Sequence, residues 1–313
     1  MQILEIIQNY IKLFIDEKNA LSGSKNTIRS YQAVLDKFYD FVTDEVSLHK
    51  KLKITDINRY FLNNYILSMD KNNLSRRTQH HHIIVIVQFL TFLADSDIKT
   101  FGAIKQNITG VKVKFEQKEI EAFNQDEQQK IIGVVKSLDK SKNFTAHRTS
   151  LILKILLFHG VRISELINLT WSNIQEEYDE ADGYVYKFTY MGKGSKERSL
   201  DFPIAFVRDN MDIIKKHKNS NYVIPSSTGG KMAQGNIYIT IKKLLAKQGI
   251  NKFGLHIFRH TFGDNNAAMN INLAVMSKLM GHSSTAITSK YYVRVSNKTK
   301  RDAIFKRINK FIE

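Results

Sequence analysis

Hydrophobic residues near the start of the chain recur at intervals of three and four positions. The residues that carry this pattern are Ile3, Ile6, Ile7, Tyr10, Leu13 and Phe14. An α-helix turns once in about 3.6 residues, so these side chains share one face and the polar residues share the other. The pattern predicts an amphipathic helix. It does not fit a signal or transit peptide, because a basic leading region is missing and acidic residues interrupt the apolar positions.

Three more helical segments are expected in the first hundred residues. The first has an apolar stripe at Ile28, Tyr31, Leu35, Phe38 and Phe41. Thr55 or Asp56 is expected to cap a second helix, and Ser75 a third that continues to Leu93. A strand-like period of two does not occur before about residue 110, so we predict an all-helical N-terminal domain over residues 1–103.

The rest of the chain predicts a different architecture. Residues 104–123 are polar, rich in lysine and poorly periodic, which is typical of a linker. Asn124 and Glu127 resemble a capping pair that opens the next helix. Over residues 124–313 helical and strand patterns alternate, with an apolar helix at 149–158, a β-hairpin around 184–202 and an amphipathic helix at 297–313. The expected fold is therefore mainly α with a small β-sheet: a helical N-terminal domain and a mixed α+β C-terminal domain.

Composition narrows the possible chemistry. The chain has 313 residues, no cysteine and a formal net charge of +17, of which residues 201–313 carry +13. The absence of cysteine excludes disulfides, thiolate catalysis and iron–sulfur clusters, and a reducing cytoplasm is the expected location. Membrane spans are not expected, because the apolar stretches are too short. The strong positive charge of the C-terminal third predicts a polyanion partner such as nucleic acid.

Four motifs in the second domain share a phosphate-related chemistry: residues 160–166 (GVRISEL), 192–198 (GKGSKER), 256–261 (HIFRHT) and 281–292 (GHSSTAITSKYY). In the third, His256 and Arg259 share one helix face, which places a proton-transfer group beside an anion-binding guanidinium. In the fourth, a tyrosine can attack phosphorus if nearby cations stabilise its phenolate. Each motif alone is also compatible with an ordinary surface or core segment.

In this order and at this spacing, the four motifs resemble those of the tyrosine recombinase, or phage integrase, family. The resemblance covers the second domain, and the helical first domain is similar to the family's DNA-clamping domain. It implies a site-specific DNA recombinase that cuts and rejoins strands through a 3′-phosphotyrosyl intermediate, with no metal, ATP or other cofactor. The residues it implies as catalytic are Arg162, Lys193, His256, Arg259, His282 and Tyr291.

The resemblance also implies a role for each of these residues. Arg162 and Arg259 would hold the non-bridging oxygens of the scissile phosphate, and Tyr291 would be the nucleophile. Lys193 would protonate the departing 5′-oxygen. His256 would assist proton transfer from the tyrosine, and His282 would donate a hydrogen bond to the phosphate. Tyr292 competes with Tyr291, but the nine residues from His282 favour Tyr291.

The expected partner is double-stranded DNA carrying a specific target site. The residues expected to contact it are Lys25, Arg29, Arg76, Arg77, Lys196 and Arg198. Lys196 also competes with Lys193 as the acid. The resemblance further implies a homotetramer on two DNA sites, with the C-terminal helix docking within its own chain or on a neighbour. It implies action at the nucleoid in the cytoplasm, and leaves room for an accessory DNA-bending protein or a partner recombinase.

Several alternatives remain open at the level of sequence. The two-domain length favours a simple Xer-like enzyme, but integration, transposition and chromosome-dimer resolution all use this chemistry. A type IB topoisomerase uses the same residue types, and a non-catalytic DNA-binding regulator would need none of them. The three histidines His80, His81 and His82 are not expected to bind a metal, because adjacent residues on a helix point about 100° apart. We interpret them as structural or phosphate-facing.

Overall fold

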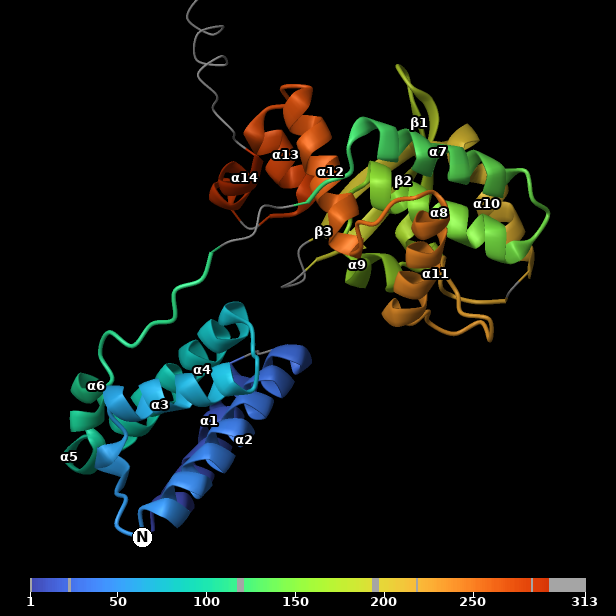
Figure 1. The fold of residues 1–313 in the computed structure, drawn as a ribbon. Helices are drawn as coiled ribbons and strands as arrows, with labels where there is room; N and C mark the ends of the chain where they lie inside the picture. Colours follow the sequence, from blue (N-terminus) through green and yellow to red (C-terminus); the bar gives the residue numbers. More distant parts are fainter. Residues whose placement is uncertain are drawn as a thin grey trace, which may run out of the picture. The chain divides into compact units, whose positions relative to one another are not determined.

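The computed structural model describes residues 2–21, 24–116, 121–192, 197–217, 219–282 and 284–292. The chain divides into two compact units, Met1–Lys118 and Glu119–Glu313. Figure 1 shows the helices and strands of the two units, and each unit has its own hydrophobic core. The fold class expected from sequence, mainly helical with one small sheet, is confirmed.

The first unit is built from helices around a core of aliphatic and aromatic side chains. Its elements are α1 (Ile3–Ala20), α2 (Lys25–Leu48), the 3₁₀ turn η1 (Ile54–Asp56), α3 (Arg59–Lys71), α4 (Arg76–Ser96), α5 (Ile98–Phe101) and α6 (Ala103–Asn107). Phe14, Phe38 and Phe89, which come from α1, α2 and α4, are fully buried in this core. Edge-to-face packing of aromatic rings, such as Phe14 on Phe89, adds to the burial of apolar surface.

Side-chain caps fix where these helices begin. Ser24 and Ser75 accept the backbone N–H groups of Thr27 and Thr78, so the cap expected at Ser75 is confirmed. The cap expected at Thr55 or Asp56 is wrong, because α3 is capped by Asn58. Asp56 instead ends η1, where its carboxylate accepts the backbone N–H of Lys53 at 2.8 Å.

The three adjacent histidines have three different partners. The His82 ring is buried and hydrogen-bonded to the Tyr65 hydroxyl at 2.9 Å. The His80 ring bonds to the Val113 carbonyl, and the His81 ring to the Ser30 hydroxyl. Each bond ties α4 to another segment of the unit, so all three histidines have a structural use.

The segment expected as a linker is partly used in packing. Ile104, Ile108, Val111 and Val113 lie in the core of the first unit, and Phe123 lies in the core of the second. The two units divide between Lys118 and Glu119. The difference from the expected 104–123 arises because isolated apolar residues among lysines are enough to anchor a chain end to a core, although they show no periodicity.

The second unit surrounds one central helix. Its helical elements are α7 (Gln125–Asp139), α8 (Phe144–Phe158), α9 (Ile163–Ile167), the 3₁₀ turn η2 (Trp171–Asn173), α10 (Ile204–His217), α11 (Gln234–Lys247), α12 (Leu255–Ala268), α13 (Leu273–Met280) and α14 (Thr285–Tyr292). Residues 147–157 of α8 are all buried, and α8 packs against α7, α9, α10 and α12 (Figure 1). The capping box expected for Asn124 and Glu127 opens α7.

The sheet is a three-stranded antiparallel meander beside α8. Its strands are β1 (Ile174–Asp179), β2 (Gly183–Met191) and β3 (Glu197–Pro203). Phe188 of β2 and Phe202 of β3 lie in the core with their rings edge to face, while Met191 pairs with Glu197 at the other end of the hairpin. That pairing brings together the residues on either side of the segment 193–196, which contains Lys193.

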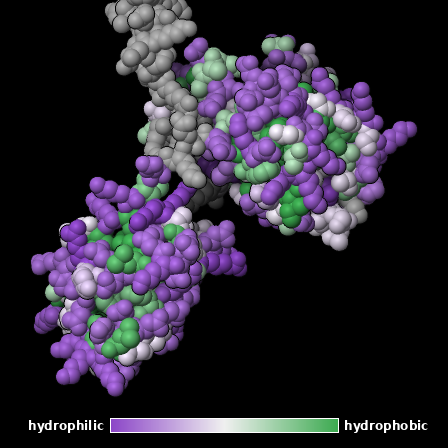
Figure 2. Space-filling model, viewed as in Figure 1, coloured by the Kyte–Doolittle hydropathy of each residue, from purple (hydrophilic) through white to green (hydrophobic). Residues whose placement is uncertain are grey.

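The surface of each unit is mostly hydrophilic on the side shown in Figure 2, with smaller apolar areas between. In the part of the chain that the structure describes, every helix is too short or too polar to cross a membrane. The amphipathic helix expected at 297–313 lies outside the described residues.

Candidate active site

Arg162 stands at the start of α9, immediately after the turn that ends α8. Gly160 makes this turn with φ of 56°, and a side chain there would come within 2.5 Å of the Phe262 ring. Glu165, one turn into α9, accepts the backbone N–H of Arg162 at 2.8 Å and its Nη1 at 2.8 Å. The Arg162 side chain remains about a third exposed, at 32%. Glu165 thus orients a guanidinium that solvent or a ligand can reach.

Arg259 reaches the same region from α12 but is buried. Its Nη1 donates to the Gly160 carbonyl at 2.9 Å, and its Nη2 donates to the Met280 carbonyl. Arg162 donates to the neighbouring Gly281 carbonyl over 3.4 and 3.5 Å. Two guanidinium groups from elements about a hundred residues apart therefore meet at the end of α13.

The end of α13 also positions His282. Gly281 is in the left-handed conformation, with φ of 61°, and this ends the helix. The Nδ1 of His282 then bonds to the Thr288 hydroxyl of α14 at 2.8 Å. Burial, together with Arg259 and Arg162, lowers the pKa of His282 to about 4, so the ring is neutral at pH 7.

His256 begins α12, one helical turn before Arg259. Desolvation and the cations Arg259 and Arg162 lower its pKa, so this imidazole is also neutral at pH 7 and able to accept a proton. His260, one turn further along α12, has its pKa lowered to about 4 by burial and by the neighbouring His256 and Arg259. The motif pattern did not single out His260.

Two of the residues expected to be catalytic are not fully described. Tyr291 lies in the last turn of α14, three residues after Thr288, and its side chain and that of Tyr292 lie outside the described residues. Lys193 and Lys196 both fall in the segment 193–196, also outside them. Of the six residues, the structure thus brings together Arg162, His256, Arg259 and His282.

Arg198 has a different environment from the one expected. The sequence suggests a DNA contact, but its side chain is only 9% exposed. Nη2 donates to Glu165 Oε2 at 2.5 Å, and Nη1 donates to the Leu279 carbonyl at 2.8 Å. The burial of Arg198 has a simple cause, since strand alternation puts it on the same face of β3 as the buried Leu200 and Phe202.

The cations expected to bind DNA in the first unit are exposed. Lys25 and Arg29 lie at the start of α2, and Arg76 and Arg77 at the start of α4. A hydrogen bond between Ser30 of α2 and His81 of α4, 2.9 Å long, joins the second turns of these helices, close to both N-termini. Arg76 also pairs with Asp70 at 3.4 Å. The first unit thus presents a cluster of basic residues at two neighbouring helix N-termini, where backbone N–H groups favour anions.

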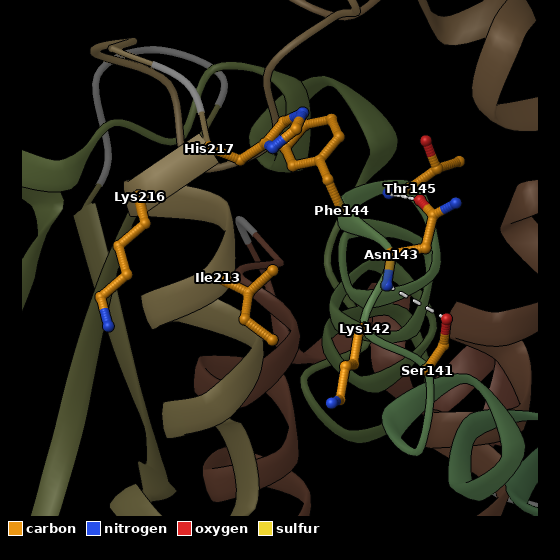
Figure 3. Close-up of a pocket in the computed structure, with 8 residues that line it drawn as sticks. All are labelled: Ser141, Lys142, Asn143, Phe144, Thr145, Ile213, Lys216 and His217. Carbon is orange, nitrogen blue, oxygen red and sulfur yellow. Dashed lines mark hydrogen bonds between the residues drawn. The ribbon is translucent and has the colours of Figure 1, made fainter.

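A surface hollow lies apart from these residues. It is formed between the α7–α8 turn and the end of α10, and Figure 3 shows Phe144 and His217 meeting at its rim. Their rings stack with centroids 4.5 Å apart. None of the residues expected to be catalytic lines it. Among the described residues, we also find no group of three or more His, Asp or Glu side chains arranged to hold a metal ion.

Comparisons with known sequences show the family of the chain. The profile of the Phage integrase family matches residues 121–299, and that of the Phage integrase SAM-like domain matches residues 6–92. The tyrosine recombinase XerC of Staphylococcus aureus (strain JH9) is 26% identical over 285 residues, which cover 89% of each chain. The chain belongs to the phage integrase family and is a tyrosine recombinase, an enzyme of site-specific DNA recombination.

Solved structures share the fold. The XerH recombinase bound to palindromic difH substrate, in a post-cleavage complex, superposes with a TM-score of 0.73 at 19% identity, covering 88% of this chain and 78% of that one. An integrase of the Tn1549 transposon, in complex with a circular intermediate DNA, gives 0.70 at 17% identity, covering 98% and 99%. A lambda integrase tetramer on a Holliday junction gives 0.63 at 14% identity, covering 95% and 80%.

Proposed function

We propose that this recombinase cuts and rejoins DNA through a covalent 3′-phosphotyrosyl intermediate formed on Tyr291. The observation that carries the proposal is the meeting of Arg162, Arg259 and His282 at the end of α13, next to the helix that contains Tyr291. Two guanidiniums can stabilise charge on phosphate oxygens, and two neutral histidines can exchange protons or hydrogen bonds, so together they support a phosphodiester reaction here.

The two arginines are assigned to the non-bridging oxygens of the scissile phosphate. Each guanidinium has five N–H donors in a planar fork that matches phosphate geometry. The Arg162 contacts with the Gly281 carbonyl, at 3.4 and 3.5 Å, are long enough for a phosphate oxygen to displace them. Fixed donors of this kind stabilise the charge that develops on the oxygens as phosphorus becomes five-coordinate.

The proton path follows from the two sides of the displacement. The Tyr291 oxygen attacks phosphorus, and His256, neutral at pH 7, takes the phenolic proton. The bond from phosphorus to the 5′-oxygen breaks, and Lys193 gives that oxygen a proton. His282 holds a phosphate oxygen by a hydrogen bond. The free 5′-hydroxyl of a partner strand reverses these steps, so no ATP is consumed.

The DNA partner and the assembly belong to the same proposal. We assign Lys25, Arg29, Arg76 and Arg77 to backbone phosphates of a double-stranded target site, on the strength of their exposure and their helix N-termini. Lys196 is assigned to a phosphate beside the hairpin. Four copies would act on two sites at the nucleoid, with the C-terminal helix expected at 297–313 docking within its own chain or on a neighbour. An integrase, a transposon recombinase and a dimer resolvase all fit this scheme.

A nicked suicide substrate tests the nucleophile. The departing strand piece diffuses away, so a covalent protein–DNA adduct accumulates, and the reaction is run in EDTA. We expect the adduct with the wild-type chain and with Tyr292→Phe, and none with Tyr291→Phe. An adduct with Tyr291→Phe would show that the nucleophile is misassigned. No adduct on any bound site would favour the non-catalytic regulator.

A further inference from the structure

One buried carboxylate serves two arginines. The Glu165 side chain is 2% exposed. Its Oε1 accepts Arg162 Nη1 at 2.8 Å, while its Oε2 accepts the backbone N–H of Arg162 at 2.8 Å and Nη2 of Arg198 at 2.5 Å. The orientation of the Arg162 guanidinium therefore depends on a carboxylate that is held from its other side by Arg198.

Arg198 also holds the turn that carries His282. Its Nη1 donates to the Leu279 carbonyl at 2.8 Å, three residues before His282. A Cβ at Gly281 would come within 2.9 Å of this Nη1 and 3.1 Å of the Arg198 Cδ. The guanidinium packs against the turn so closely that a side chain at position 281 would displace it. Arg198 further lies over the Tyr190 ring, 5.9 Å from its centroid.

The place of Arg198 in the sheet adds a third connection. It is the second residue of β3, directly after the segment 193–196, and it pairs with Tyr190 of β2. The Arg198 side chain, at the base of the hairpin, thus contacts both Glu165, which orients Arg162, and the end of α13 just before His282.

We propose that Arg198 is a positioning residue for recombination. Through Glu165 it fixes the guanidinium of Arg162, and through the Leu279 carbonyl it fixes the turn of His282, without touching DNA. This inference rests on the roles proposed for Arg162 and His282. Without Arg198, Glu165 keeps a single arginine partner and both phosphate-binding groups gain freedom. A displacement of about 1 Å in a reacting geometry lowers the rate by about 10²-fold.

The experiment compares chemistry with binding in the full-length chain. The probe is a nicked duplex at which the wild-type chain forms its covalent adduct. Arg198→Gln and Arg198→Lys are compared with Arg208→Gln, a matched control at an exposed arginine of α10. For each variant, the single-turnover rate of adduct formation and the salt dependence of the Kd for the same duplex without the nick are measured.

We expect Arg198→Gln to slow adduct formation by about 10²-fold, with the Kd and its salt slope unchanged. Arg198→Lys keeps the charge but cannot span both acceptors, so its rate should fall between those of Arg198→Gln and the wild type. Arg208→Gln should react at the wild-type rate. A rate for Arg198→Gln within twofold of wild type overturns the inference. A salt slope smaller by about one overturns it too, because that is the signature of a lost phosphate contact.

A double-mutant cycle separates positioning from general damage. Because Arg198 acts partly through Glu165, the loss in the double variant with Glu165→Gln should be smaller than the sum of the two single losses, whereas fully additive losses would overturn the inference. If Arg198→Gln does not bind DNA, the cycle is run with Arg198→Lys.

When the wild type reacts through Tyr291 and the Arg198 variants form the adduct at the wild-type rate, only this inference fails. If Tyr291→Phe still forms the adduct, the proposed function fails as well.

Discussion

At the scale of single residues, His159 shows how a polar side chain is accommodated in this core. It follows the last turn of α8, and its ring stacks on Phe202 with centroids 3.7 Å apart. Nε2 donates to the Asp201 carbonyl at 3.1 Å, which leaves Nδ1 to accept the Tyr190 hydroxyl at 2.9 Å. In the neutral form both ring nitrogens have a hydrogen-bond partner. Burial lowers the pKa of His159 to about 3.

This burial predicts a loss of stability in mild acid. Above pH 6.5 the imidazole is neutral in both the folded and the unfolded chain, so its titration does not change the free energy of unfolding. Below pH 6.5 His159 is protonated in the unfolded chain but stays neutral in the folded chain. The free energy of unfolding therefore falls as the pH is lowered from 6.5 to about 3. Unfolding by urea should show a smaller loss between pH 7 and pH 4.5 for His159→Gln than for wild type. Equal losses would contradict the prediction.

At the scale of elements, α8 depends on a buried ion pair. The Lys154 side chain is 4% exposed, and its Nζ lies 2.9 Å from Asp139 Oδ2 of α7. The same Nζ donates to Asn210 Oδ1 at 2.7 Å and to the Phe206 carbonyl at 2.6 Å, both on α10. One ammonium group therefore joins three helices and has each of its three N–H bonds directed at an acceptor.

Removing this ammonium should destabilise the second unit. Lys154→Met leaves the Asp139 carboxylate and the Asn210 amide without their cation in a partly buried site, and breaking such a pair costs about 3 kcal/mol. Lys142→Met, at an exposed lysine just before α8, is the matched control and should leave stability unchanged. The free energy of unfolding is measured by urea titration at pH 7. If Lys154→Met is as stable as the control, the ion pair does not hold the helices.

The elements also show which features are readable from sequence. Helices with a clear cap, such as Ser75 and Asn124, begin where expected. The start of α8 was expected at 149 but lies at Phe144, because the polar residues His147 and Arg148 are buried and paired rather than exposed. A helix that is enclosed on all sides has no polar face, so its periodicity cannot mark its ends.

For the candidate site, motif order was enough to select Arg162, His256, Arg259 and His282, which the structure brings together. The buried position of Arg198 was not recognised, although a signal was present. Arg198, Leu200 and Phe202 alternate along β3, and this period of two places the arginine on the inner face. Its partners Glu165 and Leu279 lie too far away in the sequence to be inferred from spacing.

At the scale of the whole molecule, the positive side chains differ in what they contact. The net charge is +17, yet the charged groups of Arg198 and Lys154 are paired with carboxylates and carbonyls inside the second unit. In the first unit, the basic residues proposed to contact DNA are those at the starts of α2 and α4. Their contribution is electrostatic and independent of DNA sequence, because each neutralised phosphate releases a counterion.

Neutralising these residues should therefore flatten the salt dependence of binding. For each of Lys25, Arg29 and Arg77 changed to Gln, the slope of log K against log salt should decrease by about 0.9. Arg76→Gln should change it less, because this arginine already pairs with Asp70. Lys50→Gln and Lys51→Gln, exposed after the end of α2, are the controls. Titrations of a labelled duplex at several salt concentrations measure the slopes, and equal effects at the control positions would refute the assignment.

The complete burial of α8 has a consequence for exchange of amide hydrogens. No face of residues 147–157 opens to solvent, so their backbone N–H groups can exchange with deuterium only when the surrounding unit unfolds. Arg162 follows this helix after a turn of a few residues, and so its backbone is attached to the segment expected to exchange last. The slowest-exchanging peptide of the second unit should thus end next to the arginine proposed to bind the phosphate.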